Sequence, residues 1–334
     1  MDTPKYLTLT DVAQMTHNGN ILEFAKEFQK ETSLFQTLPW KQSSDMLHDQ
    51  TGVLGELPTP TWTGLDKGVK PSKGTWKKRE ENIALVESWS ITNEKTYQVS
   101  PNGDALRWQN DRLHILAMGL DAEEKLLYGN PDVDENQPLG FMPRMNVLTD
   151  RHAMKSGVRQ KHVCLSCGGS TNGKQSSILF VGRGPMAPHL LYPRYKANNG
   201  ITFNAFPFEN DKDAEGGYIR TAKSQFIMMF GLSIANYQSV GRIANVDTSD
   251  STSVAMIADA MYEMFSAFPR EYRSSVSIWA PSNVILAIRK LYAGRVSPAT
   301  YKDAIYPNAI GDVLFDSFLI HQCDSMLETE DVVA

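Results

Sequence analysis

The sequence contains few cysteines and no long apolar run. Its three cysteines are Cys164, Cys167 and Cys323, an odd and sparse set. A secreted disulfide framework is therefore unexpected, and a reducing compartment fits better. The N-terminus lacks the apolar stretch of a signal peptide, and no run approaches the roughly 18 apolar residues of a membrane span. The sequence thus predicts neither a secretory leader nor a membrane contact.

An excess of positive charge is also missing. The formal net charge is -5, whereas a protein that neutralises DNA phosphates tightly usually carries a basic excess. Lys77, Lys78 and Arg79 form a basic run, but Glu80 and Glu81 follow directly and cancel it locally. If this protein meets nucleic acid, we expect it to enclose the nucleic acid rather than to grip it.

Catalytic motifs are the third absence. The seven histidines show no H-E-x-x-H pattern, and no G-x-S-x-G motif is present. Asp132, Asp134 and Glu135 cluster, but their spacing is not that of a calcium loop, and a solvated loop is the better interpretation. We therefore expect no catalytic, cofactor-binding or metal-binding residues.

One segment resembles a phosphate-binding loop. Gly168 to Lys174 has the spacing G-x-x-x-x-G-K, in which backbone N–H groups and a lysine bind phosphates. However, Gln175 stands where the motif needs a hydroxyl group for Mg²⁺, and a strand-like run, Ser177–Val181, follows where a helix should begin. We interpret the segment as a turn between strands, with a nucleotide-binding enzyme as the alternative.

Cys164 and Cys167 have the spacing of a zinc or redox pair. A structural zinc ion needs four ligands. His162 could be a third, but Cys323 is distant and no second pair exists. A redox pair would precede a helix, whereas two glycines follow here. Ordinary thiols near a turn are the preferred interpretation, with a metal-binding or redox enzyme as the alternative.

The composition is that of a globular protein, and the sequence predicts one long loop. Its 334 residues are 41% hydrophobic and 21% charged, which suits one large or two modest domains. Between Thr51 and Gly74, five glycines and three prolines occur among 24 residues, so no periodicity survives. Apolar residues then alternate at strand spacing from Ile83 to Ile91. These patterns predict a long two-stranded projection, which needs a surface to lie on because an isolated hairpin is only marginally stable.

The longest predicted helix covers roughly residues 104–128. Asp104 is placed to cap its start, and Gly129 with Pro131 is placed to end it. Four leucines recur every seven residues along it: Leu106, Leu113, Leu120 and Leu127. The intervening seam positions are largely polar, so we predict a helix packed along a sheet rather than a coiled coil.

The remaining pattern mixes shorter helices and strands. Helical segments are predicted at Leu9–Met15, at Ile21–Phe28 before Leu38-Pro39, from Asp250 or Ser251 to Pro269, and from Ser282 to Gly294. Strands are predicted at Ser177–Val181, His189–Tyr192, Gln225–Asn236, Val276–Ala280 and Phe318–Cys323. Because strands and helices do not alternate regularly, we predict an α+β fold rather than a doubly wound sheet.

The order of these elements resembles the Hong Kong 97-type (HK97-like) major capsid proteins of tailed bacteriophages. The residues that carry the resemblance are Thr8-Leu-Thr-Asp-Val-Ala13, Phe35-Gln-Thr-Leu-Pro-Trp40, Gly129-Asn-Pro131, Leu139-Gly-Phe-Met-Pro-Arg144, Gly168-Gly-Ser-Thr171, Ser176-Ser-Ile-Leu-Phe-Val-Gly182, Leu190-Leu-Tyr-Pro193, Gly231-Leu-Ser-Ile-Ala235, Arg242-Ile-Ala-Asn-Val246 and Leu327-Glu-Thr-Glu330. Each is unspecific by itself, but their order extends over most of the chain.

The resemblance implies a domain organisation. It suggests an N-terminal arm at 1–44, an extended loop called the E-loop with flanking strands at 45–88, and mainly a P-domain at 89–245 that holds a spine helix near 104–128. It further suggests mainly an A-domain at 246–310, and a return strand with the C-terminal tail at 311–334. The arm begins near residue 8, so the resemblance suggests that any scaffolding is a separate protein.

The resemblance also implies a function without catalysis. Such proteins self-assemble into hexamers and pentamers of an icosahedral shell that encloses double-stranded DNA by non-specific contact. Portal, scaffolding and decoration proteins are the expected partners, in a virion assembled in the host bacterial cytoplasm. Some members cross-link subunits through an E-loop lysine; Lys67, Lys70 and Lys73 lie in that region, where solvated lysines are the simpler interpretation. An encapsulin-type nanocompartment shares the fold and is the alternative shell. A different virion structural protein, such as a tail or portal component, is a further alternative.

Overall fold

The computed structural model describes residues 33–149, 162–184, 186–194, 200–212, 216–293, 313–315 and 318–334. The segments predicted as helices at Leu9–Met15 and Ile21–Phe28, and the predicted helix stop at Gly294, lie outside these residues. The chain divides into two compact units. The first contains the chain up to Asp49, together with 81–140 and 189–232; the second contains 50–80, 141–188 and the chain from Ser233 onward.

The first unit is built on a long antiparallel pair of strands. β3 (Thr75–Asn93) and β9 (Tyr218–Ser233) are paired from Ile83 opposite Gly231 to Asn93 opposite Thr221. Among the described residues they belong to a seven-stranded sheet with the order β1-β6-β9-β3-β2, in which β7 and β8 also pair with β9. The other strands are β1 (Trp40–Gln42), β2 (His48–Glu56), β6 (His189–Tyr192), β7 (Ile201–Ala205) and β8 (Glu209–Lys212).

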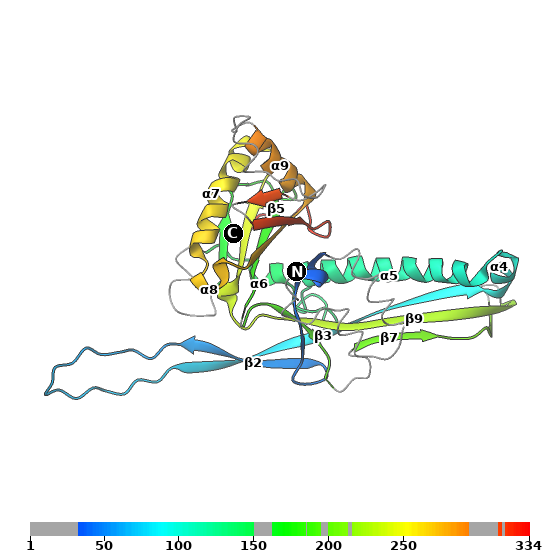
Figure 1. Cartoon of the computed structure of the whole chain (residues 1–334), viewed down its shortest axis with the longest axis horizontal. Helices are drawn as coiled ribbons and strands as arrows, with labels where there is room; N and C mark the ends of the chain where they lie inside the picture. The colour runs from blue at the N-terminus through cyan, green and yellow to red at the C-terminus, as the bar shows by residue number, and fades with distance from the viewer. Residues whose placement is uncertain are drawn as a thin grey trace. The chain divides into compact units, whose positions relative to one another are not determined.

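A long helix, α5 (Gly103–Tyr128), lies along this strand pair (Figure 1). The predicted packing of a helix along a sheet is thus confirmed. The predicted cap at Asp104 is wrong: the N-cap is Asn102, whose side-chain oxygen accepts a hydrogen bond from the Ala105 N–H. Asparagine there satisfies an N–H group that has no partner within the helix.

The helix ends at Gly129, as predicted. A side chain at this position would collide with the carbonyl oxygens of Lys125 and Pro138, so the close approach of the chain requires glycine. Two short helices belong to the same unit: α3 (Ser33–Thr37) and α4 (Glu94–Val99).

The leucine repeat of α5 does not form its buried face. Leu113 and Leu120 are exposed at 64% and 44%, whereas Leu127 is fully buried. The residues that the helix buries along its length are Asp111, Ile115, Met118, Gly119, Ala122, Glu123, Leu126 and Leu127. These buried positions recur at three- and four-residue spacing, as expected for the side of a helix that lies on a sheet.

The second unit contains a mixed sheet. Among the described residues its strand order is β12-β13-β11-β5-β10-β4, with parallel pairing between β10 and β4 and between β11 and β13. The strands are β4 (Val163–Ser166), β5 (Ser176–Gly182), β10 (Val240–Val246), β11 (Val276–Ala280), β12 (Val313–Phe315) and β13 (Phe318–Gln322). The predicted strands at residues 177–181, 189–192, 276–280 and 318–323 are confirmed within one residue.

Helices cover one face of this sheet. α7 (Ser251–Ala267) begins at Asp250, whose carboxylate accepts a hydrogen bond from the Thr252 N–H, as one of the two predicted caps. α9 (Ser282–Ala293) packs against α7 and β13. Shorter helical segments are α6 (Phe141–Arg144), α8 (Arg270–Arg273) and the 3-10 helix η3 (Tyr237–Ser239). With two sheets and segregated helices, the chain has the predicted α+β architecture.

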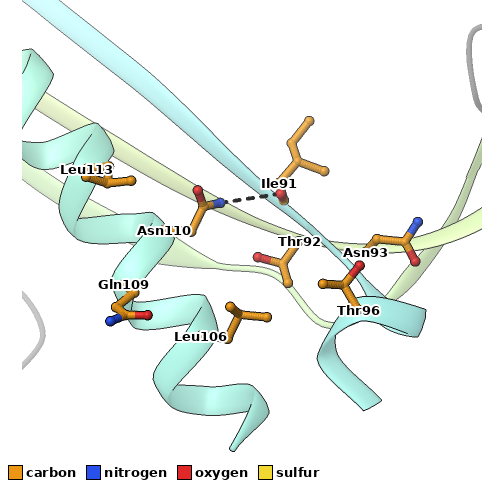
Figure 2. Close-up of a pocket in the computed structure, with 8 residues that line it drawn as sticks. All are labelled: Ile91, Thr92, Asn93, Thr96, Leu106, Gln109, Asn110 and Leu113. Carbon is orange, nitrogen blue, oxygen red and sulfur yellow. Dashed lines mark hydrogen bonds between the residues drawn. The ribbon is translucent and has the colours of Figure 1, made fainter. Parts of the chain in front are cut away.

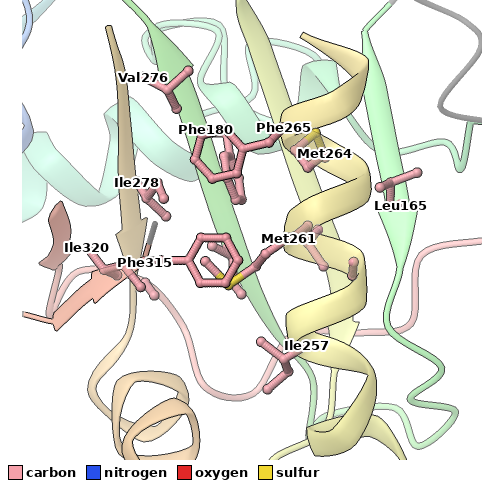
Figure 3. Close-up of a cluster of buried hydrophobic side chains, with 14 of the residues drawn as sticks. Leu165, Phe180, Ile257, Met261, Met264, Phe265, Val276, Ile278, Phe315 and Ile320 are labelled. Carbon is pink, nitrogen blue, oxygen red and sulfur yellow. The ribbon is translucent and has the colours of Figure 1, made fainter. Parts of the chain in front are cut away.

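The main hydrophobic core lies between these helices and the sheet (Figure 3). Phe265 of α7 is central: its ring stacks on Phe315 at 5.8 Å and meets Phe180 edge to face at 5.5 Å. Met261 and Met264 lie beside it on the same face of α7 and are buried. The predicted inner face of this helix is therefore confirmed, because its apolar residues recur at helical spacing.

Candidate functional site

The first unusual surface is the connection between β2 and β3. Residues 57–74, which we call the β2–β3 extension, form neither helix nor strand. Its internal hydrogen bonds are few and local, such as the Thr63 hydroxyl group to the Lys67 carbonyl oxygen at 2.9 Å and the Ser72 hydroxyl group to the Thr59 carbonyl oxygen at 2.9 Å. The predicted long glycine- and proline-rich loop is confirmed for residues 57–74, whereas Thr51–Glu56, which was predicted as part of it, belongs to β2.

The extension exposes large apolar side chains. Trp62 and Leu65 are fully exposed, at 101% and 107%, and Leu57 and Val69 are about half exposed. Single exposed apolar residues are common on soluble proteins, but several on one narrow segment mark a surface that becomes covered. Lys67, Lys70 and Lys73 are also exposed on this segment.

The second unusual surface is the free edge of β3. Beyond Ile83, whose N–H donates to the Leu47 carbonyl oxygen, no strand among the described residues pairs with the edge of β3 that faces away from β9. Alternate residues of a strand present their backbone groups to the same edge, so those of Leu85, Trp89 and Ile91 point outward there. Their side chains are also about half exposed. Natural proteins rarely leave such a long apolar edge uncovered.

A groove borders the end of this edge, between β3 and the first turns of α5 (Figure 2). We call it the α5–β3 groove, and its volume is about 590 Å³. Its lining consists of Ile91, Thr92, Asn93, Thr96, Leu106, Gln109, Asn110 and Leu113. Leu106 and Leu113 are its two aliphatic residues on α5, five further residues can form hydrogen bonds, and Ile91 contributes its carbonyl group while its side chain points away from α5 (Figure 2).

Polar contacts hold the walls of the groove at a fixed separation. The Asn110 amide nitrogen donates to the Ser90 hydroxyl oxygen at 2.9 Å, and it also approaches the Ile91 carbonyl oxygen at 3.5 Å (Figure 2). One turn earlier on α5, the Arg107 guanidinium group donates to the Lys223 carbonyl oxygen at 3.0 Å and to the Ser224 hydroxyl oxygen. Serine and threonine on this face of the strands leave room for the helix and supply its hydrogen-bond partners.

The structure explains the segment that resembles a phosphate loop. Gly168 and Gly173 have φ of 85° and 74°, and the turn leads into β5 rather than into a helix. Its backbone N–H groups are occupied: those of Gly173 and Gln175 donate to the carbonyl oxygen of Glu330. The turn therefore binds the C-terminal segment of the chain. It leads into a strand, as the sequence predicted.

The cysteine pair lies in the protein interior. Cys164 and Cys167 are buried, and burial raises the pKa of each thiol to about 11. The Cys167 thiol also donates to the Ser253 carbonyl oxygen at 3.3 Å. No group of histidine, cysteine or acidic residues within the described part of the chain could hold a metal ion. Neutral, buried thiols are poor nucleophiles and poor ligands.

The acidic loop and the basic run have local partners. The Asp134 carboxylate accepts hydrogen bonds from the backbone and side chain of Asn136, and these bonds lower its pKa. Arg79 donates to the Ile234 carbonyl oxygen at 3.1 Å and lies over the Tyr237 ring, 4.2 Å from its centre. In the segments that the structure describes, no helix is long and apolar enough to cross a membrane.

Comparison with known proteins identifies the family. The model of the family "Major capsid protein GP7" matches residues 16–334, nearly the whole chain. The chain belongs to the GP7 family of major capsid proteins. The resemblance noted in the sequence is thus confirmed, and the protein is a structural component of a bacteriophage capsid with an HK97-like fold.

The structure of a bacteriophage Epsilon15 chain agrees with the fold of this capsid protein. A chain of bacteriophage Epsilon15 is 19% identical, with a TM-score of 0.63 over 88% of this chain and 87% of that one. Weaker matches include the capsid of a native GTA particle, 9% identical with a TM-score of 0.40 over 64% and 89% of the two chains. The SrpI encapsulin complex of Synechococcus elongatus is 14% identical, with a TM-score of 0.37 over 65% and 88%. No curated protein matches the sequence.

For a capsid protein, the relevant sites are surfaces rather than a catalytic centre. Sequence reasoning found the β2–β3 extension but missed the α5–β3 groove. A signal for the groove was present, because Leu106 and Leu113 belong to the leucine repeat that the sheet cannot bury. The strand alternation from Ile83 to Ile91 did not indicate which residues of β3 lie next to α5.

Proposed function

We propose that this capsid protein assembles into hexamers and pentamers of an icosahedral shell that encloses double-stranded DNA. The observation that carries the proposal is the β2–β3 extension, whose apolar side chains at Trp62 and Leu65 are fully exposed in a single copy. Contacts that are individually weak stabilise a closed shell when each copy makes several of them with different neighbours. The extension and the free edge of β3 supply two such surfaces.

The net charge supports a container for DNA rather than a DNA-binding protein. At -5 the chain carries no basic excess that would hold packaged DNA tightly. Portal, scaffolding and decoration proteins are further partners that such a shell requires. The protein would then reside in the virion after assembly in the cytoplasm of the host bacterium.

The domain assignment is part of this proposal. The extension and its strands at 45–88, which include most of β3, act as the E-loop, and α5 with β9 forms the centre of the P-domain within 89–245. Residues 246–310 lie mainly in the A-domain, where β11 shares its sheet with β5 and β10. Residues 1–44 act as the arm, and 311–334 provide the return strand and the tail.

Replacement of the extension tests the proposal. Gly55 and Thr75 lie next to each other where β2 and β3 separate, so residues 56–74 can be replaced by a two-residue Asn-Gly turn. We expect a folded, soluble subunit that forms no stable shells in negative-stain electron microscopy, whereas the unmodified chain forms shells. Normal shells from the shortened chain would contradict the proposed role of the extension.

The contents of purified particles separate the two kinds of shell. Nuclease-protected double-stranded DNA in particles from infected cells supports a phage head. Particles that instead hold a co-purified protein, with no protected DNA, would favour an encapsulin-type compartment.

A further inference from the structure

The C-terminal segment, residues 330–334, is held by side chains of the second unit rather than by a strand ladder. It forms neither helix nor strand, and one isolated bridge, at Glu330, pairs its backbone. The side chains of Glu330 and Val333 are buried, whereas Asp331 between them is exposed and Val332 is half-buried. An extended segment that buries two side chains at a fixed spacing is typical of a bound peptide.

Glu330 is recognised by a buried cation. The Arg242 guanidinium group donates to the Glu330 carboxylate at 2.8 Å and to the Ser177 hydroxyl oxygen at 2.9 Å, and this hydroxyl group donates to the same carboxylate. The carbonyl oxygens of Met142 and Met145 accept further hydrogen bonds from Arg242 and orient it independently of the C-terminal segment. A fixed, buried guanidinium group selects a carboxylate, because charge-assisted hydrogen bonds are strong where water is excluded.

Val333 is recognised through its backbone and its side chain. The Asn245 side-chain oxygen accepts a hydrogen bond from the Val333 N–H at 2.8 Å, and the Asn245 amide nitrogen donates to the Val333 carbonyl oxygen at 2.9 Å. One side chain thus supplies the two hydrogen bonds that a neighbouring strand would supply. The valine side chain packs in a small apolar cluster with Cys164 and Ala244, and Leu148 lies against this cluster. This end of the site therefore selects a small apolar residue.

The surrounding structure holds Asn245 in a backbone conformation that few residues adopt. Its φ of 58° lies in the left-handed region, and the residue is buried. Its carbonyl oxygen accepts a hydrogen bond from the Gly169 N–H at 2.9 Å, and its amide nitrogen also donates to the Ser166 hydroxyl oxygen at 3.1 Å. Conformations of this kind persist where neighbouring structure fixes them, and they are common where a ligand is clamped.

We propose that Arg242 and Asn245 form a peptide-recognition site for the sequence Glu-x-x-Val, and that the C-terminal segment is its ligand. Each end of the segment contacts a buried polar side chain whose position the sheet and its turn fix. Between the two ends, the Val332 N–H donates to the Asn172 side-chain oxygen at 3.0 Å, a backbone contact that places no demand on the valine side chain. The site is separate from the surfaces assigned to shell formation, and any peptide with the same pattern competes for it.

The C-terminal segment has an advantage over such competitors because it is tethered. Residues 323–329 join it to β13, which ends at Gln322 in the same sheet. A short connection gives the tethered ligand an effective concentration in the millimolar range. A peptide added from outside should therefore bind well only after the connection has been cut.

Cleavage of this connection tests whether the segment is a ligand. A recognition sequence for a site-specific protease is inserted between Glu328 and Thr329, which are both exposed, and the folded chain is then cut. The cut chain should keep its circular dichroism spectrum, because departure of the whole segment opens Arg242 to water and leaves no buried charge unpaired. A fluorescent peptide with the sequence of residues 329–334 should then bind to the cut chain, as measured by anisotropy, and roughly tenfold or more weakly to the uncut chain.

The outcomes of the cleavage are distinct. A cut segment that co-elutes with the chain in gel filtration would support the proposal as well, since no covalent bond then holds it. Unfolding on cleavage would mean that the segment is part of the fold and would overturn the proposal. Loss of the segment from a folded chain that then fails to bind the peptide would overturn it too.

Matched peptides test the two recognised positions. Glu330→Gln and Asp331→Asn remove the same charge from the peptide, but the first alone removes the partner of Arg242. We expect the Glu330→Gln peptide to bind about tenfold or more weakly, and the Asp331→Asn peptide to bind within about twofold of the unmodified peptide. Val333→Ala should likewise weaken binding more than Val332→Ala does. Equal affinities within either pair contradict the pattern Glu-x-x-Val.

Hydrogen exchange of the unmodified chain gives an independent test that needs no cleavage. The N–H groups of Val332 and Val333 should exchange together and about tenfold or more faster than those of β5, because a ligand can leave while the sheet stays folded. Exchange at the same rate as β5 would mean that the segment leaves only when the sheet unfolds, and the site would then not be one that a peptide can enter.

Discussion

Arg242 carries a positive charge in the interior of the second unit. Its side chain is almost fully buried and donates to the Glu330 carboxylate at 2.8 Å, to the Ser177 hydroxyl oxygen at 2.9 Å and to the Met145 carbonyl oxygen at 3.1 Å. A buried ion pair adds little compared with apolar residues of the same shape, but loss of one partner leaves an uncompensated charge. Glu330 therefore attaches the C-terminal segment to the sheet.

We predict that Glu330→Gln lowers the free energy of unfolding by about 3–5 kcal/mol, because it leaves the guanidinium charge without a counterion. Urea denaturation followed by circular dichroism measures the change. The matched control is Glu328→Gln, since this exposed carboxylate accepts hydrogen bonds from Ser282 and Asn283 at the start of α9 and should cost no more than about 1 kcal/mol. Equal losses from both substitutions would contradict the role of the buried pair.

The cysteines are the second feature at the residue scale. We predict that Cys164 and Cys167 do not react with a thiol reagent at pH 8 until the protein is unfolded, because burial excludes the reagent and keeps the thiols neutral. Their folded pKa values of about 11 lie above the ordinary value of 9.0, so the stabilisation by the neutral thiols is complete below pH 9 and is lost as the pH rises towards 11. Timed labelling with Ellman's reagent, first of the folded and then of the unfolded protein, measures the reactivity of the thiols.

Trp62→Cys provides the positive control for labelling, because position 62 is fully exposed. Its added thiol should react at once in the folded subunit. Rapid labelling of the unmodified chain would instead indicate an accessible pair and would revive the alternative of a metal or redox site.

At the scale of elements, the start of α5 decides where the wall of the groove lies. The cap at Asn102 places the first turn next to α4, where the Tyr97 hydroxyl group donates to Asp104 at 2.8 Å. This hydrogen bond raises the pKa of Tyr97. The side chains of Leu106 and Leu113 follow one and three turns later. A shift of this start would therefore move the groove relative to β3.

We predict that Asn102→Ala lowers the free energy of unfolding by about 1 kcal/mol, because an N–H group at the start of the helix loses its acceptor. Asn102→Asp should preserve stability, since aspartate caps equally well and its negative charge interacts favourably with the positive end of the helix dipole. Thermal unfolding of the two variants and of Asp104→Ala measures the difference. If Asp104→Ala proves the more destabilising of the alanine substitutions, Asn102 is not the residue that matters at this helix start.

At the scale of the whole molecule, the extension should be the point of attack for a protease. Lys67, Lys70 and Lys73 are exposed in a segment without regular hydrogen bonding, which is the kind of site that proteases cleave first. We predict that limited trypsin digestion of the free subunit cuts within residues 57–74 and gives one small and one large fragment. In assembled shells the same bonds should be cut at least tenfold more slowly, because the extension lies on a neighbour.

Mass spectrometry of the fragments locates the cleavage. A chain in which the three lysines are replaced by glutamine serves as the control and should resist trypsin in both states. Equal cleavage rates in subunits and shells would mean that the extension stays exposed after assembly.

The sequence by itself determined the elements that depend on local pattern. The glycines and prolines between Thr51 and Gly74 disfavour regular structure, so a long loop was predictable, although Thr51–Glu56 belongs to β2. The apolar residues from Ile257 to Phe265 recur at helical spacing and form a single stripe. The sequence alone therefore identified the face of α7 that is buried. The strand that follows Lys174 was also predictable, since the element that follows a motif is a local property.

The tertiary structure decided everything that depends on which elements meet. The cap of α5 fell on Asn102 rather than Asp104, because both residue types cap well and packing against α4 selects the start. The leucine repeat did not indicate which side of α5 is buried, because the strand pair buries only the residues that 3.6-residue spacing brings to it. The edge of β3 beyond Ile83 has no partner strand among the described residues, and no pattern within β3 itself records where a partner strand stops.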